Sequence, residues 1–405
     1  MPAPNSQNIC NVDAIVLGAG AAGMMCAAVA GQRGRRVLLL DHAGAPGKKI
    51  LISGGGRCNF TNLEVRPECF LSHNRHFAKS ALGRYRPADF IALVDRYGIA
   101  WHEKTLGQLF CDGSARAIVD MLLAECERGS VTLGLSAPVR DIRHADGRFT
   151  VHFENGVASA GSLVIATGGP SIPKIGASGF AYDIARQFGL SVIEPRPALV
   201  PLTLGEADAD FMAIPGVASP TVARCGKTAF EEAFLFTHRG LSGPAILQIS
   251  SYWRAGEPIT LDLAPSAPAD WLITAKRERP RGELRSALTT ALPARLAGVI
   301  AERLRTLVPS GRDLGNVPDR VLADIERQLR EWRFEPTGTE GYAKAEVTAG
   351  GIDTAVLSSR TLEAKAIPGL YVIGEAVDVT GWLGGYNFQW AWASGHAAGQ
   401  AIIPT

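Results

Sequence analysis

The twelve residues VDAIVLGAGAAG, at positions 12–23, contain the pattern that decides the fold. An apolar stretch runs directly into glycines at Gly18, Gly20 and Gly23, and small residues continue with helical character to Gln32. A strand that ends in GxGxxG at the start of a helix is typical of dinucleotide-binding folds. In that motif the first glycine permits a tight turn, the second lets the backbone approach a pyrophosphate, and the third allows close packing of the helix.

A second apolar run, RVLLL at residues 36–40, predicts another buried strand and completes a βαβ unit. This run ends at Asp41, 23 positions after Gly18. An acidic residue at about this distance binds ribose hydroxyls in dinucleotide folds, and the helix N-terminus favours the phosphates. We therefore expect an α/β fold with a bound dinucleotide.

The composition sets the size and excludes several classes of protein. At about 150 residues per domain, 405 residues predict two to three domains. A net charge of +2 gives no global attraction to nucleic acid or to anionic membranes. One local exception is KRERPRGELR at residues 276–285, which has five basic and two acidic residues. We interpret it as a solvated helix face or loop, with a polyanion site as the alternative.

The cysteines and histidines argue against a metal or dithiol centre. The seven cysteines are odd in number and contain no CxxC motif, so we expect buried thiols in a reducing cytoplasm. His73 and His76 have HxxH spacing, but no neighbouring carboxylate or cysteine joins them in the sequence, so we expect surface histidines and no metal. The charge-free residues 14–31 have no basic residues before them, so we expect neither a signal peptide nor a membrane span.

Two further segments favour FAD over NAD as the dinucleotide. IATGG at residues 165–169 resembles the ATG segment of two-domain flavoproteins, and GLYVIGE at residues 369–375 resembles their last strand, whose terminal acid holds the flavin ribityl chain. An NAD enzyme has no use for that second acid. The sequence has no second GxGxxG, so NAD(P)H, if it donates electrons, binds transiently without a Rossmann domain of its own.

Three longer segments carry a resemblance to one family. They are SGGGRCNFTN at residues 53–62, THRGLSGP at residues 237–244 and GWLGGYNFQWA at residues 381–391. With these segments the chain resembles the HI0933-like flavoproteins, also called the BaiN/YhiN or aminoacetone oxidase family.

The resemblance implies a glutathione-reductase-type FAD-binding domain that is discontinuous in sequence. This domain would comprise residues 1–190 and 342–405. An inserted β-rich domain would span residues 191–268, and an inserted helical domain would span residues 269–341.

The resemblance also assigns cofactor-binding roles, position by position. The adenosine side and the pyrophosphate would be held by Gly18, Gly20, Ala22, Gly23 and Asp41. The glycine-rich loop would line FAD with Lys49, Gly55, Arg57 and Cys58, and Val139 would offer its backbone to adenine. The residues expected at the flavin half include Thr167, Gly168 and Gly374. Glu375 would make the ribityl contact, with Asp378 as the second candidate. The start of the last helix would contribute Gly385, Tyr386, Asn387 and Phe388. Independently of the family, a helix N-terminus at that place would stabilise the negative charge of reduced flavin near N1.

Tyr386 and His238 are the side chains that we select as candidate catalytic groups. Packing or ring stacking explains Tyr386 equally well, and His238 equally suits a loop anchor. We expect an FAD-dependent oxidoreductase that transfers hydride between flavin N5 and a small organic substrate, with NAD(P)H as donor. An amine oxidase-type enzyme that uses O2 is one alternative. A flavoprotein that modifies or binds RNA is the other, although the near-neutral charge argues against nucleic acid as a partner.

Overall fold

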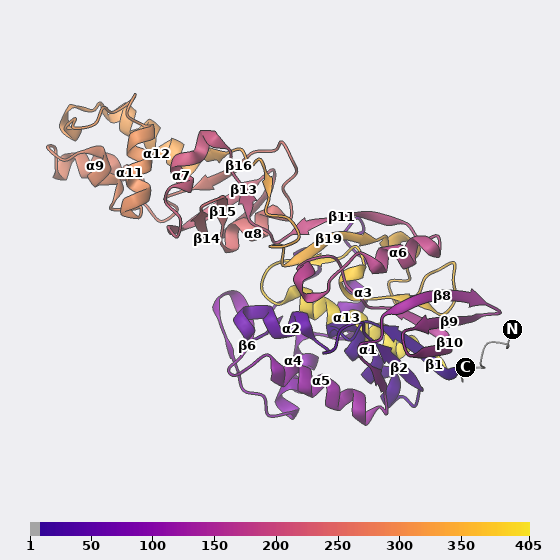
Figure 1. The fold of residues 1–405 in the computed structure, drawn as a ribbon. Helices are drawn as coiled ribbons and strands as arrows, with labels where there is room; N and C mark the ends of the chain where they lie inside the picture. Colours follow the sequence, from indigo (N-terminus) through magenta and orange to yellow (C-terminus); the bar gives the residue numbers. More distant parts are fainter. Residues whose placement is uncertain (1–8) are drawn as a thin grey trace. The chain divides into compact units, whose positions relative to one another are not determined.

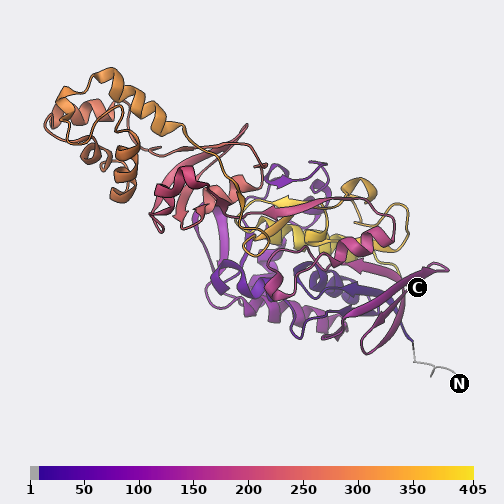
Figure 2. The same cartoon turned by 45° about the horizontal axis from the view of Figure 1, so that its top comes forward.

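The computed structural model describes residues 9–405 and divides the chain into two compact units (Figures 1 and 2). Unit 1 comprises the chain up to Arg196 together with Val347–Thr405, and unit 2 comprises Pro197–Glu346. Both ends of the chain therefore contribute to one unit. In the described residues, no helix combines the length and apolar character needed to cross a membrane.

Unit 1 is built on a seven-stranded sheet in which the first strand is central. The order is β7-β2-β1-β10-β9-β8, and β20 also pairs with β10. The strands are β1 (Cys10–Leu17), β2 (Val37–Leu40), β7 (Thr132–Gly134), β8 (Val139–Ala145), β9 (Arg148–Phe153), β10 (Gly156–Ile165) and β20 (Leu370–Val372). β1 pairs in parallel with β2 and β10, and β10 pairs in parallel with β20, so a strand from the C-terminal segment completes the sheet of the N-terminal one.

Helices and short strands surround this sheet. The helices of unit 1 are α1 (Ala21–Gln32), α2 (Lys48–Ile52), α3 (Lys79–Arg84), α4 (Pro87–Arg96), α5 (Arg116–Arg128), α6 (Phe180–Gln187) and α13 (Tyr386–Ala401). The short strands are β3 (Asn59–Asn62), β4 (Phe70–Leu71), β5 (Trp101–Glu103), β6 (Gln108–Cys111), β11 (Val192–Ala198), β19 (Val347–Ile352) and β21 (Thr380–Gly381).

Residues 44–62 are rich in glycine and polar residues, a composition that predicts one long loop, but the structure shows regular elements there. They form α2, a 3-10 turn at Ser53–Gly56 and β3, which pairs antiparallel with β6. Gly54 and Gly55 adopt φ of 56° and 66°, a region that favours glycine. The expectation of a loop was wrong because the strand depends on pairing with β6, which lies almost fifty residues away, and not on a local apolar pattern.

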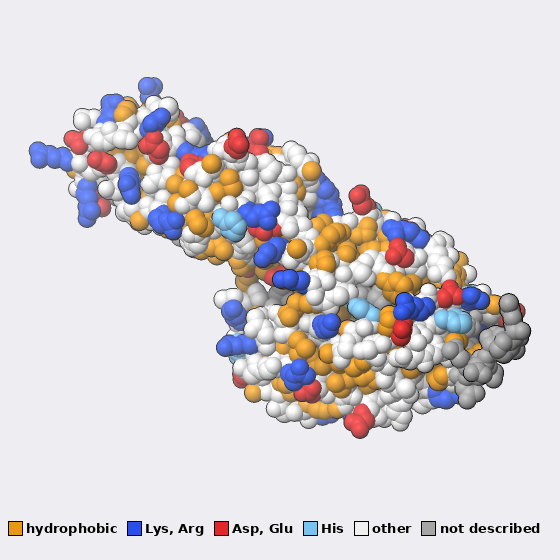
Figure 3. Space-filling model, viewed as in Figure 1, with side chains coloured by type: hydrophobic (Ala, Val, Ile, Leu, Met, Phe, Trp, Pro, Cys, Tyr) orange, Lys and Arg blue, Asp and Glu red, His pale blue; other side chains and the backbone are white. Residues whose placement is uncertain are grey.

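Unit 2 contains a second seven-stranded sheet, in the order β17-β16-β13-β14-β15-β12-β18. Its strands are β12 (Leu202–Thr203), β13 (Ala218–Cys225), β14 (Thr228–Thr237), β15 (Gly240–Ser242), β16 (Ile259–Asp262), β17 (Trp332–Phe334) and β18 (Gly338–Thr339). Its helices are α7 (Ala209–Met212), α8 (Pro244–Ser250), α9 (Trp271–Glu278), α10 (Leu284–Leu288), α11 (Ala294–Arg303) and α12 (Asp319–Arg330). Lys and Arg side chains stand out on the surface of its helical part (Figure 3).

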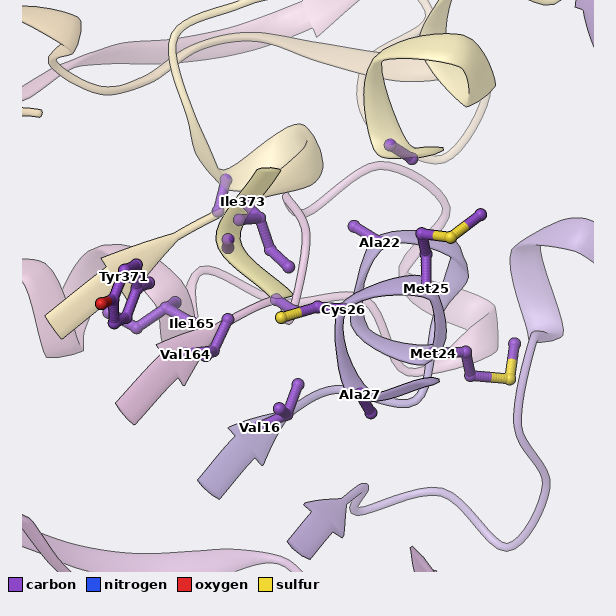
Figure 4. Packing of buried hydrophobic residues seen from close by; sticks show 14 of the residues in the cluster. Val16, Ala22, Met24, Met25, Cys26, Ala27, Val164, Ile165, Tyr371 and Ile373 are labelled. Atoms are coloured by element: carbon purple, nitrogen blue, oxygen red, sulfur yellow. The ribbon is translucent and has the colours of Figure 1, made fainter. Parts of the chain in front are cut away.

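The buried core of unit 1 positions the glycine turn between two helices and the sheet. Val16 on β1, Val164 on β10 and Tyr371 on β20 belong to the same buried cluster as Met24, Cys26 and Ala27 of α1 (Figure 4). α13 packs on α1 through glycines: a Cβ at Gly395 would lie 2.5 Å from the carbonyl oxygen of Ala22. The backbones of α1 and α13 can therefore approach more closely than larger side chains would allow.

Candidate functional site

The three glycines of the GxGxxG motif have different surroundings. A Cβ at Gly18, whose φ is +105°, would lie 2.5 Å from the oxygen of Ala166, and a Cβ at Gly23 would lie 1.9 Å from the oxygen of Gly18. At Gly20, by contrast, no atom of the described chain would come within 4 Å of a Cβ. Two glycines are thus required by packing, whereas Gly20 faces open space, as a pyrophosphate contact requires.

Asp41 follows β2 and connects the glycine turn to the next loop. Its Oδ2 accepts a hydrogen bond from the backbone N–H of Ala19 at 2.7 Å, and its Oδ1 accepts one from Ala43 at 2.8 Å. A carboxylate has about four lone-pair positions, so Asp41 can still accept bonds from ribose hydroxyls. Ala22, in the first turn of α1, is buried against the position of Gly374.

Glu375 and Lys49 form an ion pair within a group of hydrogen-bonded polar side chains in unit 1. Lys49 Nζ lies 2.5 Å from Glu375 Oε2 and also donates to Ser171 Oγ. Glu375 Oε1 accepts from Ser171 Oγ and from the backbone N–H of Thr348, both at 2.9 Å. These bonds hold the Glu375 carboxylate in one orientation, while 19% of its side chain remains exposed.

Ser171 and Thr348 are residues that the sequence did not single out. Ser171 stands two positions after IATGG, and Thr348 lies in the otherwise apolar β19. The sequence signal that could have identified these two residues is a Ser or Thr in a stretch expected to be buried, close to a segment predicted to bind the cofactor. Their place beside Glu375 depends on pairing of segments far apart in the chain.

Two buried hydroxyls in this region find no hydrogen-bond partner among the described residues: Thr167 Oγ1 and Thr348 Oγ1. Leaving a buried hydroxyl unpaired costs about 1–3 kcal/mol. Thr167 belongs to the ATG segment, and its Cα lies 3.0 Å from a Cβ placed on Gly18. A polar ligand that runs from the glycine turn past Thr167 towards Glu375 would satisfy such groups, so the residues present fit FAD.

In the glycine-rich loop after α2, Gly55 and Arg57 are exposed, whereas Cys58 is buried. Gly55 is exposed, with φ of +66° and no described atom within 4 Å of a Cβ. Arg57 is exposed, and its guanidinium has no ion pair within residues 9–405. Cys58 is completely buried, so its side chain packs inside the protein, and a contact with FAD would come from its backbone. Burial also raises the pKa of its thiol.

Asp378 is anchored inside the protein by His73. Its Oδ2 accepts hydrogen bonds from the backbone N–H of His73 at 2.9 Å and lies 3.0 Å from His73 Nδ1. The side chain of Asp378 is 5% exposed, compared with 19% for Glu375. The difference favours Glu375 for the ribityl contact. It also corrects the sequence interpretation of His73 as a histidine without a carboxylate neighbour, although the described chain contains no cluster of three metal-ligating side chains.

The start of α13 presents backbone N–H groups rather than polar side chains. Gly385 has φ of +92°, and a Cβ there would lie 2.3 Å from the oxygen of Thr61. The first N–H groups of a helix have no intrahelical acceptor, which leaves those of Tyr386, Asn387 and Phe388 available to an anion. The Asn387 side chain is occupied, because its Oδ1 accepts from Gly381 N at 2.8 Å.

Tyr386 lies in an aromatic surrounding at this helix start. Its ring meets Phe70 and Trp382 edge-on, with centroids 6.1 and 6.2 Å apart. Burial, followed by the effect of nearby Cys69, raises the pKa of the phenol far above its usual range. Tyr386 therefore stays protonated at neutral pH and can donate a hydrogen bond or a proton, but it cannot act as a base.

The remaining predicted residues are Val139, Gly168 and His238. Val139 is the first residue of β8, next to an irregularity in its pairing with β9. Gly168 has φ of +72° and is half-buried. His238 is exposed in the turn between β14 and β15 of unit 2, where Thr237 Oγ1 accepts from the N–H of Arg239. Thus unit 1 contains every predicted cofactor residue, whereas His238 belongs to unit 2.

Comparisons with known proteins agree with this geometry. The sequence model of the HI0933-like protein Rossmann domain matches residues 12–401. The ribosomal RNA dihydrouridine synthase of Escherichia coli (strain K12) is 52% identical over 402 residues, which are 96% of this chain and 98% of that protein. A 3-dehydro-bile acid delta(4,6)-reductase of Clostridium scindens is 27% identical over 407 residues, 95% and 98% of the two chains. Among solved structures, a 3-ketosteroid-delta4-(5alpha)-dehydrogenase from Rhodococcus jostii RHA1 shares the fold, with a TM-score of 0.50, 13% identity and 98% coverage of both chains.

Proposed function

Because the chain belongs to the HI0933-like family of Rossmann flavoproteins, we propose that it uses FAD to reduce uridine in ribosomal RNA to dihydrouridine. Membership of this family by itself identifies the general enzyme class, an FAD-dependent oxidoreductase. The specific reaction is supported by 52% identity, over almost the full length of both chains, to a protein named for this reaction.

The cradle in unit 1 supports the cofactor assignment. The open position at Gly20 and the carboxylate of Asp41 would hold the pyrophosphate and ribose. Glu375, oriented by Lys49, and the unpaired hydroxyl of Thr167 would bind the ribityl side. The N-terminus of α13 would stabilise negative charge on the flavin.

The reaction requires the chain to supply a proton. When bound, FAD supplies a hydride equivalent at its N5 atom. Reduction of the C5=C6 bond of uridine places that hydride on one carbon and a proton on the other. A protonated group is therefore needed over the ring, and Tyr386 is the candidate because its phenol hydroxyl stands at the start of α13, where the flavin is expected.

NAD(P)H is the proposed source of electrons. The sequence contains a single GxGxxG motif, which FAD would occupy, so the donor would bind transiently and leave. Reduction is also the direction named by the second relative, a reductase that acts on a bile-acid derivative. We therefore favour reduction over the oxidase alternative.

The proposal reverses the expectation that nucleic acid is not a partner. That expectation came from the net charge of +2, and net charge averages over surfaces that differ strongly. A small organic substrate remains the second candidate, supported by 27% identity to the bile-acid reductase.

The test uses the FAD-loaded protein under anaerobic conditions. NADPH and NADH are added separately, and loss of flavin absorbance identifies the donor. Unmodified ribosomal RNA transcript is then added, and dihydrouridine is detected by mass spectrometry of the digested RNA. The expected result is recovery of flavin colour together with a gain of two hydrogens on a uridine. Recovery with a steroid enone, but not with RNA, would instead support the second candidate.

A further inference from the structure

Five exposed arginines of unit 2 lie at the end of α9, at the start of α12 and in the segments beside these two helices. Arg277, Arg279, Arg281, Arg312 and Arg320 are all exposed, and none of them forms an ion pair within the described residues. We call these five residues the arginine patch. Resting on the proposed function, we propose that the arginine patch binds the phosphate backbone of the RNA substrate.

Backbone interactions hold the members of the arginine patch together. The segment after α9 receives hydrogen bonds from the segment before α12: Leu314 N–H to the oxygen of Gly282 at 2.8 Å, and Gly315 N–H to that of Pro280 at 2.7 Å. Lys276 on α9 adds a third link, because its Nζ donates to the oxygen of Val317 and to Asp319, each at 2.7 Å. The two segments that bear the arginines are therefore neighbours.

Favourable interaction with a helix dipole explains the position of only some of these positive side chains. Lys276 and Arg277 lie in the last turn of α9, where a cation is favoured by the helix dipole. Arg320 is the second residue of α12, where the dipole opposes a cation. Arg279 and Arg281 lie outside both helices. A cation kept at an unfavourable site without a carboxylate points to an anion from outside the chain.

Three other exposed arginines of unit 2 are each neutralised by a neighbouring acid. Arg305 pairs with Glu302 at 2.9 Å, Arg327 with Asp324 at 2.8 Å and Arg333 with Glu335 at 3.0 Å. Lys and Arg side chains gather on the helical part of unit 2 in Figure 3. The contrast separates the arginine patch from an ordinary solvated surface.

RNA is the partner that suits this arrangement. Guanidinium groups bind phosphate with two parallel hydrogen bonds, and several of them on neighbouring segments can contact successive phosphates of one chain. Such contacts give affinity without reading the sequence. The choice of uridine would then be made at the flavin, and the arginine patch would hold the RNA.

The experiment compares two triple variants that lose the same charge. The test variant is Arg279→Gln, Arg281→Gln, Arg320→Gln, and the control is Arg305→Gln, Arg327→Gln, Arg333→Gln. Binding to a ribosomal RNA transcript is measured from low to high salt, and thermal unfolding verifies that both variants are folded. We expect the test variant to lose at least about tenfold in affinity and the slope of log K against log salt to fall by about 2. The control should bind like the unmodified protein.

Equal affinity of the test variant and the unmodified protein would overturn the proposal, and so would an equal loss in both variants. Polyglutamate that binds as tightly as RNA at the same charge concentration would assign the arginine patch to an acidic protein and also overturn it. Dihydrouridine formation by the unmodified protein is scored separately. Absence of dihydrouridine would reject the proposed function. Normal RNA binding by the test variant would reject only the proposed role of the arginine patch.

Discussion

At the scale of single residues, the fingerprint glycines separate into packing positions and a ligand position. We predict that Gly20→Ala folds normally, with stability within about 0.5 kcal/mol of the unmodified protein, because no described atom lies near its Cβ. It should nevertheless bind FAD more weakly, because the methyl group would occupy the space of the pyrophosphate. Gly23→Ala should instead fail to fold properly, since its Cβ would lie 1.9 Å from the Gly18 oxygen. Denaturant unfolding and FAD titration measure the two effects. Full FAD affinity in Gly20→Ala would contradict the assignment.

Also at the residue scale, Tyr386 is testable as a proton donor. We predict that Tyr386→Phe lowers the rate of uridine reduction by about 100-fold or more, while FAD content and reduction by NAD(P)H stay normal. The reason is that the phenol hydroxyl, at the helix start expected beside the flavin, can donate a proton, whereas phenylalanine cannot. Tyr371→Phe is the control, because Tyr371 is also buried but lies within the sheet on β20. An unchanged rate in Tyr386→Phe would leave the ring with a packing role only.

At the scale of elements, the close contact of α1 with α13 depends on glycine. Replacing glycine by alanine inside a helix normally raises the free energy of unfolding by about 0.5–1 kcal/mol. We predict a loss of about 1–3 kcal/mol for Gly395→Ala, because the added carbon would lie 2.5 Å from the Ala22 oxygen. Gly83→Ala in α3 is the matched control in unit 1, since no described atom would lie within 4 Å of its Cβ. Urea unfolding compares the two, and a stabilising Gly395→Ala would contradict this packing.

A second element-scale prediction concerns the connection between β1 and β2. Burial alone would raise the pKa of Asp13, but hydrogen bonds from Arg36 and from the N–H of Thr405 lower it from 3.8 to about 2. A lowered folded-state pKa stabilises the protein above pH 3.8, and this contribution is lost as the pH falls towards 2. Asp13→Asn should therefore cost about 1–2 kcal/mol at pH 7, after allowance for the exposed arginine. In urea unfolding at pH 6 and pH 3 the difference should shrink at the lower pH, and an equal difference would contradict the prediction.

At the scale of the whole molecule, the residues that we propose bind FAD all belong to unit 1, although they come from both ends of the chain. We predict that FAD at a hundredfold excess over its Kd adds about 2.7 kcal/mol to the stability of the state that binds it. Hydrogen exchange should therefore slow in unit 1 when FAD is added. Exchange in the core of the unit 2 sheet, such as Phe234 and Phe236 on β14, is the internal control. Equal protection of both units would argue that they unfold together.

What the sequence determined by itself was local. The βαβ unit at residues 12–40, the glycine turn and α13 follow from apolar periodicity and from glycine spacing, which act between near neighbours. Glu375 and Lys49 were identified by the resemblance of their segments to those of known flavoproteins. These patterns need no knowledge of distant segments.

Only the tertiary structure decided how those residues are used. Ser171 and Thr348 join Lys49 and Glu375 because segments more than a hundred residues apart meet in unit 1. Cys58 proved to be core, and Asp378 proved to be bound by His73. Burial, hydrogen-bond saturation and the unpaired arginines of unit 2 depend on which distant groups surround a side chain. A one-dimensional pattern does not contain that information.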